Sequence, residues 1–186
     1  KKVSYSAGIL KLFDEAITNA TDNIERYAKT KSQNKTTDIR IKVTKNYIEV
    51  YNNGPSIPIE RKEFSEGKMM YLPQMVFGKL NTSGNYDNTK DRERNGCNGV
   101  GIKLANIFSK RFEIDVIHKN KHYKQIFEDN MTIINDPIIE DSNEKDSVLI
   151  RFYPDVARFD IDCINEDTLA MIHKRTYDSM LFNVNL

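Results

Sequence analysis

Three polar side chains follow one another at helical spacing near the start of the chain. Glu15, Asn19 and Asn23 stand four residues apart, so on a helix they share one stripe. A carboxylate can polarise a water molecule, an amide oxygen can bind Mg²⁺, which prefers hard oxygen ligands, and a second amide can contact a phosphate. A solvated helix face shows the same pattern, and the stripe alone does not decide between these interpretations.

Two further segments combine glycine with polar residues. The run Asn52-Asn53-Gly54-Pro55-Ser56-Ile57-Pro58 follows a predicted strand. An amide there can read the edge of a flat ring, and glycine allows the backbone a close approach. Residues 96–103 are rich in glycine and open a predicted helix, where N–H groups and the helix dipole attract an anion. Taken singly, the first segment is also typical of a plain turn and the second of a loop hinge.

Together the three segments predict a site for a nucleoside triphosphate with Mg²⁺. The helix stripe supplies a metal ligand and a base, the turn reads the nucleobase, and the glycine-rich loop with Lys103 holds the phosphates. The loop is not a Walker A sequence, because Gly-Lys-Ser/Thr is missing. It is not a dinucleotide-binding fingerprint either, because it follows a long loop rather than a strand.

The elements that must position these residues are helices and hairpins. Periodicity predicts helices at 8–27, 69–80, 102–108 and 166–180, and strands at 38–44, 47–51, 112–117, 122–127 and 148–152. Residues 81–98 and 136–146 are predicted to be loops, the first of them long enough for a lid or a binding loop. Since hairpins outnumber crossovers, we expect an α+β fold with a mostly antiparallel sheet and helices on one face.

Composition narrows the function further. The chain has 186 residues, 39% of them hydrophobic, which predicts one domain over 1–186. A net charge of +1 excludes a strongly basic nucleic-acid module and predicts weak DNA binding or none by this segment alone. No apolar run approaches the ~20 residues of a membrane span. The two cysteines are too few for a disulfide scaffold and match no zinc-binding spacing with the three histidines.

Longer motifs, in order along the chain, resemble the ATPase region of eukaryotic type II DNA topoisomerases. They lie at 13–23, 51–58, 77–87 and 96–104, with shorter matches at 106–109, 123–125, 129–131 and 152–155. The resemblance implies the GHKL, or Bergerat, ATPase fold, a two-layer α/β sandwich with a mixed sheet. Gyrase-type topoisomerases, heat-shock 90 chaperones, mismatch-repair ATPases and sensor histidine kinases share it. The Asn-Asn-Gly turn and the 77–87 segment are similar to the eukaryotic and viral topoisomerase branch.

The resemblance also implies a role for each matching residue. Glu15 would be the general base that positions the attacking water, Asn19 would bind Mg²⁺, and Asn23 would contact phosphate. The other implied ATP contacts are Asn53, Ile57 and Phe77 around adenine, Ser83, Gly84 and Asn85 at ribose and phosphate, and Asn98, Gly99, Val100, Gly101 and Lys103 around the triphosphate, with Lys103 also counted as catalytic.

Partners and location follow from the same resemblance. It implies ATP and Mg²⁺ as cofactors, DNA as the substrate of the full-length enzyme, a homodimer, and a nuclear location or a viral replication site. The family's N-terminal strap and transducer domain are missing from the chain. We therefore expect the isolated chain to be monomeric and to bind ATP better than it hydrolyses it.

Four positions depart from the family pattern, and two other functions remain open. Ser56 stands where a glycine is usual, Gly84 where a serine is common, and Cys97 where an arginine or threonine is common. Val148 stands where a threonine often helps to bind adenine, although Ser147 beside it leaves the register open. These departures bear on the fine affinity for adenine and ribose. The alternatives are a nucleotide-sensing module with little hydrolysis and another ATPase of the superfamily, such as a chaperone or repair ATPase. The 77–87 segment argues against the latter.

Overall fold

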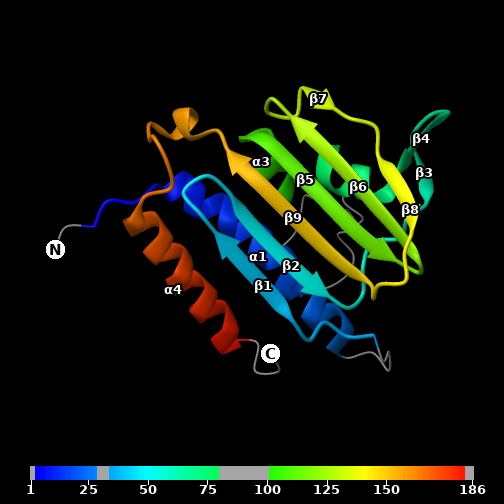
Figure 1. Ribbon diagram of the computed structural model, residues 1–186, viewed down its shortest axis with the longest axis horizontal. Helices are drawn as coiled ribbons and strands as arrows, with labels where there is room; N and C mark the ends of the chain where they lie inside the picture. Colours follow the sequence, from blue (N-terminus) through cyan, green and yellow to red (C-terminus); the bar gives the residue numbers. More distant parts are fainter. Residues whose placement is uncertain (1–2, 29–33, 80–100, 183–186) are drawn as a thin grey trace, which may run out of the picture.

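The computed structural model describes residues 3–28, 34–79 and 101–182 (Figure 1). The helices are α1 (Ala7–Ala28), α2 (Leu72–Gly78), α3 (Gly101–Ile107) and α4 (Glu166–Phe182), with a short 3-10 helix η1 (Val156–Phe159). The strands are β1 (Ile39–Val43), β2 (Ile48–Asn53), β3 (Arg61–Ser65), β4 (Lys68–Tyr71), β5 (Ser109–His118), β6 (Lys121–Glu128), β7 (Ile133–Ile134), β8 (Ile138–Asp141) and β9 (Ser147–Pro154).

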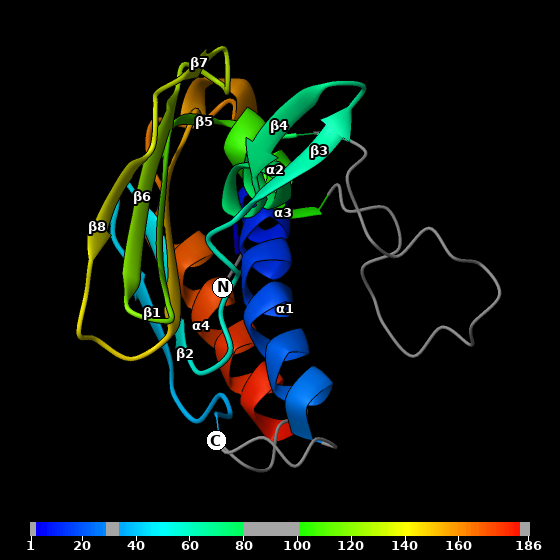
Figure 2. The same ribbon diagram turned by 90° about the vertical axis from the view of Figure 1, so that its right-hand side faces the viewer.

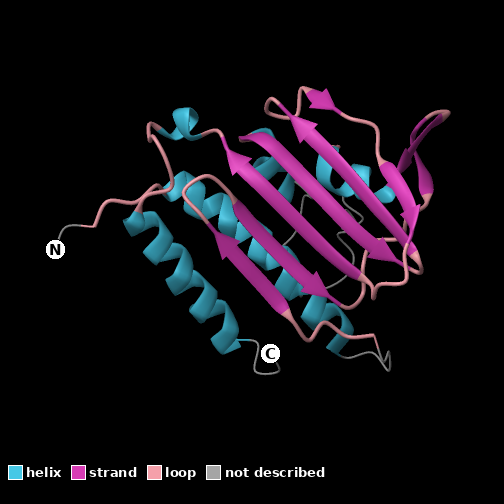
Figure 3. Cartoon of the chain, viewed as in Figure 1, coloured by secondary structure: helices cyan, strands magenta, loops and turns pink. Residues whose placement is uncertain are grey.

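One large sheet and one layer of helices make up the described part of the chain. The sheet has the order β1-β2-β9-β5-β6-β7, with β8 also paired to β6, and its described pairings are all antiparallel. Strands β3 and β4 form a separate hairpin (Figure 3). Figure 2 shows α1, α2, α3 and α4 on the same side of the large sheet. The predicted α+β class, with helices on one face, is confirmed.

Helix α1 packs on the sheet through an apolar stripe. Ile9, Phe13, Ala16, Ile17 and Ala20 are each at most 4% exposed and recur at the spacing that places them on one side of a helix. The inner faces of β2, β5 and β9 supply the other half of this core. The stripe therefore fixes which side of α1 turns away from the sheet.

A cluster of phenylalanines joins α2 to the sheet. The ring of Phe112 on β5 lies 6.1 Å from that of Phe77 on α2, 6.2 Å from that of Phe127 on β6 and 6.3 Å from that of Phe152 on β9. Offset and edge contacts of this kind are favourable beyond the area they bury. The cluster holds the end of α2 in place over the centre of the sheet.

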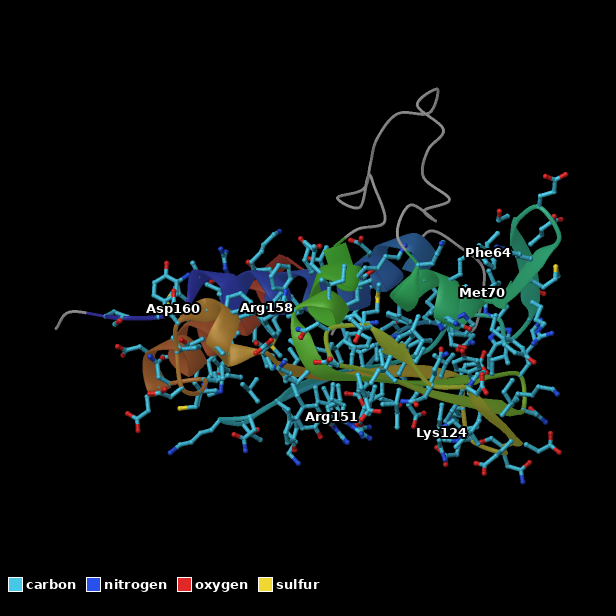
Figure 4. The ribbon with its side chains drawn as sticks, turned by 90° about the horizontal axis from the view of Figure 1, so that it is seen from above. Phe64, Met70, Lys124, Arg151, Arg158 and Asp160 are labelled. Carbon is cyan, nitrogen blue, oxygen red and sulfur yellow. The ribbon has the colours of Figure 1, made fainter. Side chains whose placement is uncertain are left out.

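The other face of the sheet carries paired charges. Arg151 on β9 lies 2.6 Å from Glu49 on β2 and 3.1 Å from Glu113 on β5, and Lys124 on β6 lies 3.3 Å from Glu140 on β8. Figure 4 shows Arg151 and Lys124 on the side away from the helices. An antiparallel sheet can leave one face to water, and oppositely charged neighbours make that face polar without leaving like charges side by side.

Two of the predicted stretches have a different structure, and strands β3 and β7 were not predicted at all. Residues 69–71 belong to strand β4 and not to the predicted helix, which begins only at Leu72. Proline is tolerated in the first turn of a helix and Pro73 stands there, so it marks the true start. The stretch 136–146, predicted to be a loop, contains β8, which pairs with β6 so that Ile139 lies opposite Tyr123. Ile138 and Ile139 favour an extended backbone, and the pairing with β6 completes the strand.

Among the described residues, no helix combines the length and the apolarity needed to cross a membrane.

Two glycines with positive φ offer a matched test of the turn after β2. Gly54 has a φ of +92°, and a Cβ there would lie 2.6 Å from the Thr36 backbone nitrogen, whereas Gly67 has a φ of +71° and open space around it. Gly67→Ala meets only left-handed strain, so we expect a loss of about 1 kcal/mol in the free energy of unfolding. Gly54→Ala adds the backbone clash, and we expect at least about 2 kcal/mol. Urea unfolding measures both, and equal losses would contradict the contact with Thr36.

Candidate functional site

Glu15 lies on α1 where the start of α3 comes close. A Cβ added at Gly101, the first residue of α3, would overlap Glu15 Oε2. The other carboxylate oxygen, Oε1, forms an ion pair with Lys11 one turn earlier. The hydrogen bond to Glu15 raises the pKa of Lys11 above its usual value, and partial burial opposes this shift. The carboxylate is thus held between a lysine and a glycine backbone, with its side chain 23% exposed.

Asn19 lies one turn beyond Glu15 on the same side of α1. Its Nδ2 donates a hydrogen bond of 2.7 Å to the backbone carbonyl of Glu15. This bond orients the amide and leaves Oδ1 as the outward acceptor on an exposed side chain. Asn23 lies in α1 as predicted, but its side chain is outside the described residues. The predicted stripe therefore exists for Glu15 and Asn19.

The oxygen atoms on this side of α1 suit a hard cation that also binds water and phosphate oxygens. No three His, Cys, Asp or Glu side chains gather as a metal site within residues 3–28, 34–79 and 101–182. The oriented Oδ1 of Asn19 is a neutral oxygen ligand, which fits Mg²⁺ bound through few protein groups together with water and phosphate oxygens. The residues present therefore fit Mg²⁺ carried by a nucleotide.

The end of β2 places its two neighbouring asparagines on opposite faces of the sheet. Burial alternates along this strand, with Ile48, Val50 and Asn52 buried toward the helices and Asn53 on the opposite face, as a period of two requires. Asn53 Oδ1 accepts hydrogen bonds of 2.9 Å from the backbone nitrogens of Thr37 and Asp38, and its Nδ2 donates to Thr37 Oγ1. The adenine role predicted for Asn53 does not fit this geometry, because its amide is already used.

Asn52 is the amide that faces the helix layer. It is 6% exposed, and its Nδ2 donates to the backbone carbonyl of Asn53. Val148 on β9 lies opposite Asn52 in the register and packs against the core, so the inward position belongs to Val148 and not to Ser147. Counting the strand parity from Ile48 and Val50 would have found Asn52 from the sequence alone.

The remaining described candidates lie deeper than the sequence suggested. Lys103, in the first turn of α3, is 1% exposed, and burial lowers its pKa below the usual value. Phe77 is 4% exposed and belongs to the aromatic core, while Ile57 is partly buried against that core. Ser83, Gly84, Asn85, Asn98, Gly99 and Val100 lie outside the described residues, as does Cys97.

Comparison with known proteins assigns the family. Residues 6–154 match the family described as histidine kinase-, DNA gyrase B- and HSP90-like ATPase. The chain belongs to this ATPase family. Its glycine at the start of α3 and the acid and amide stripe of α1 therefore lie in an ATP-binding ATPase domain.

Relatives within the ATPase family are type II topoisomerases. The chain is 40% identical over 183 residues to DNA topoisomerase 2 of Plasmodium falciparum, covering 96% of this chain and 13% of that protein. It is 39% identical over 183 residues to DNA topoisomerase 2 of Candida albicans, covering 96% of this chain and 12% of that protein. The chain thus spans about an eighth of the length of these curated relatives.

Solved structures of the same family share the fold. The ATPase region of Saccharomyces cerevisiae topoisomerase II superposes with a TM-score of 0.82 at 34% identity, covering 92% of this chain and 44% of that one. The ATPase and transducer domains of DNA topoisomerase II from Balamuthia mandrillaris give a TM-score of 0.84 at 30% identity, covering 96% of this chain and 46% of that one.

The contact between Glu15 and Gly101 predicts a variant that separates activity from stability. In Gly101→Ala the new methyl group takes the place of Oε2. The end of a flexible side chain can rotate away, so we expect the free energy of unfolding to change by less than about 1 kcal/mol. The displaced carboxylate should lower ATP turnover at least about tenfold. Thermal unfolding and steady-state hydrolysis test this, and unchanged turnover would contradict a catalytic position for Glu15.

The neighbouring asparagines of β2 predict opposite phenotypes. Asn53→Ala removes three hydrogen bonds to Thr37 and Asp38, so we expect a loss of about 1–2 kcal/mol in stability and at most a small change in ATP affinity. Asn52→Ala should leave stability closer to the wild type and raise the dissociation constant for ATP about tenfold. Calorimetric titration and urea unfolding of both variants test this. A loss of affinity confined to Asn53→Ala would restore the original assignment.

Proposed function

We propose that this chain is the ATP-binding and ATP-hydrolysing region of a type II DNA topoisomerase. The observation that carries the proposal is the Glu15 carboxylate lying against Gly101, with the Asn19 amide one turn along on the same side of α1. The similarity to topoisomerase 2 proteins over 96% of the chain supports the same function.

Each described residue takes one task in hydrolysis. Glu15 orients a water molecule for in-line attack on the γ-phosphate and takes up its proton. Asn52 reads the adenine edge from β2, and Ile57 and Phe77 line the space beside it. Lys103, in the first turn of α3, adds positive charge near the phosphates. Asn19 would hold Mg²⁺, which would supply positive charge for the phosphate oxygens.

The undescribed part of the chain completes this proposal. Ser83, Gly84 and Asn85 would contact ribose and phosphate. Asn98, Gly99 and Val100, together with Gly101, would wrap the triphosphate, and Asn23 would contact a phosphate from α1.

The full-length protein supplies the rest of the activity. We propose that it is a nuclear or viral homodimer in which ATP binding closes a gate on one DNA duplex while another passes. A net charge of +1 leaves DNA binding mainly to other parts of the protein, and the isolated chain is expected to be monomeric. ATP-dependent passage of one duplex through another by the full-length protein tests this function. Turnover without any stimulation by DNA would favour a chaperone-like or repair-like ATPase.

Replacing the proposed base tests the hydrolytic function. In the full-length protein, Glu15→Ala should retain ATP binding within a few-fold and reduce turnover at least about 100-fold, because a positioned general base contributes that much. Steady-state ATP hydrolysis and equilibrium binding of a non-hydrolysable analogue provide the two measurements. Wild-type turnover in Glu15→Ala would remove Glu15 from the mechanism.

Asn19→Ala is the matched control on the same helix stripe. It should weaken the analogue only when Mg²⁺ is present, whereas Glu15→Ala should respond to Mg²⁺ as the wild type does. Equal weakening with and without Mg²⁺ would assign Asn19 to the nucleotide and not to the cation.

A further inference from the structure

Three segments that are far apart in the sequence meet at Ser56, His118 and Asp146. Ser56 follows the turn after β2, His118 ends β5, and Asp146 precedes β9. Figure 1 shows the end of β2, the turn between β5 and β6, and the start of β9 at the same end of the strands. We call the three residues the clasp.

The hydrogen atoms of the clasp can be assigned from its geometry. Ser56 Oγ donates a hydrogen bond of 2.6 Å to the backbone carbonyl of Ile117. A serine hydroxyl has one hydrogen, so the 2.9 Å contact between Ser56 Oγ and His118 Nδ1 requires the ring to donate. His118 therefore carries its hydrogen on Nδ1, and Ser56 both donates to β5 and accepts from it.

Asp146 ties the same histidine to the turn after β2. Its Oδ2 lies 3.5 Å from His118 Nδ1, and its Oδ1 accepts a 2.9 Å hydrogen bond from the backbone nitrogen of Lys119. Its backbone carbonyl accepts a 3.0 Å hydrogen bond from the nitrogen of Gly54. Asn34 Nδ2 reaches Oδ2 at 3.3 Å. Asp146 thus joins three loops at one end of the strands.

The clasp has the residue types of a hydrolase triad without its geometry. In a triad the acid and the nucleophile face different nitrogens of the imidazole ring, which lets the histidine accept the nucleophile's proton. Here Ser56 Oγ and Asp146 Oδ2 both face Nδ1. Nδ1 is already protonated, so Ser56 is not activated and the clasp is a positioning device.

The clasp and Asn53 hold the two sides of one short turn. Asn53 fixes the beginning of the turn to Thr37 and Asp38, and Gly54 leaves it at a φ of +92°. The glycine brings no side chain to the turn, so hydrogen bonds from its neighbours hold the turn in place. Besides the bond from the Gly54 nitrogen to Asp146, Ser56 two residues later bonds to Ile117 and His118.

We propose that Ser56, through His118 and Asp146, positions the β2 turn so that Asn52 selects adenine over other bases. This inference rests on the proposed ATP site and assigns the control of base preference to residues outside it. Hydrogen bonds weaken steeply when their angle departs from linearity, so a small displacement of Asn52 lowers the preference for the base that it fits. Phosphate contacts made from α1 and α3 do not depend on this turn.

The test compares Ser56→Ala with Thr132→Ala in the full chain. Thr132 also uses its hydroxyl for one hydrogen bond to a carbonyl, that of Asp129, in a turn outside the clasp. With Mg²⁺ present, Ser56→Ala should reduce the ratio of the GTP to the ATP dissociation constant about fivefold, the effect of about one hydrogen bond. Thr132→Ala should leave this ratio unchanged. If the ratio of the GTP to the ATP dissociation constant is unchanged in Ser56→Ala, the inference is overturned. Binding of ATP by the wild-type chain would still support the proposed function.

Histidine variants give an independent test if Ser56→Ala does not fold. The amide nitrogen of an asparagine can occupy the place of Nδ1, so His118→Asn should keep the wild-type base preference, whereas His118→Leu should lose it to the same degree as Ser56→Ala. Equal preference in both variants would overturn the positioning role. A wild-type chain that binds neither ATP nor GTP would refute the proposed ATP site itself, a result distinct from either variant outcome.

Discussion

The site depends on how closely the beginning of α3 approaches the polar side of α1. Gly101 leaves room for the Glu15 carboxylate, and any side chain there would occupy the same space. This approach is possible because α1 presents its apolar stripe to the sheet and so turns Glu15 and Asn19 away from it. Packing of an amphipathic helix thereby determines the chemistry on its other side. The position of Glu15 beside Gly101 is thus a consequence of how the core packs.

The sheet contributes a second constraint through its strict alternation of faces. A shift of one position along β2 exchanges a residue that looks into the helix layer for one that looks away. Asn52 and Asn53 are identical in type. Asn52 is buried and lies opposite Val148, whereas Asn53 accepts hydrogen bonds from the backbone at 37–38. The turn that follows is held from both sides, by Asn53 and by the clasp of Ser56, His118 and Asp146. A site that reads a flat base needs this rigidity.

The two faces of the sheet differ in polarity and in what packs on them. One face carries the aromatic cluster around Phe112 and supports the helices that present the site. The other is covered by paired charges such as Arg151 with Glu49 and Glu113. Ion pairs in contact with water add little to stability, and here they keep this face of the sheet polar.

Local patterns in the sequence determined most of the elements. The helical spacing of Phe13, Ala16 and Ile17 defines α1, and the alternation in β1 and β2 with a short turn defines their hairpin. The stripe of Glu15 and Asn19 was also readable, because residues four apart share a helix face wherever the helix lies. The ordered motifs suffice to indicate the ATPase family, without any tertiary contact.

Only the tertiary structure decided which groups meet. The two isoleucines of β8 favour an extended form, but they do not specify β6 as the strand with which β8 pairs. The sequence could not show that Gly101 lies against Glu15, since 86 positions along the chain separate them. Ser56, His118 and Asp146 are likewise distant in sequence. They meet because β2, β9 and β5 are neighbours in the sheet and the segments that carry these residues lie at the same end of the strands. Side-chain periodicity is a local property of the backbone, whereas long-range contacts depend on how the whole core packs.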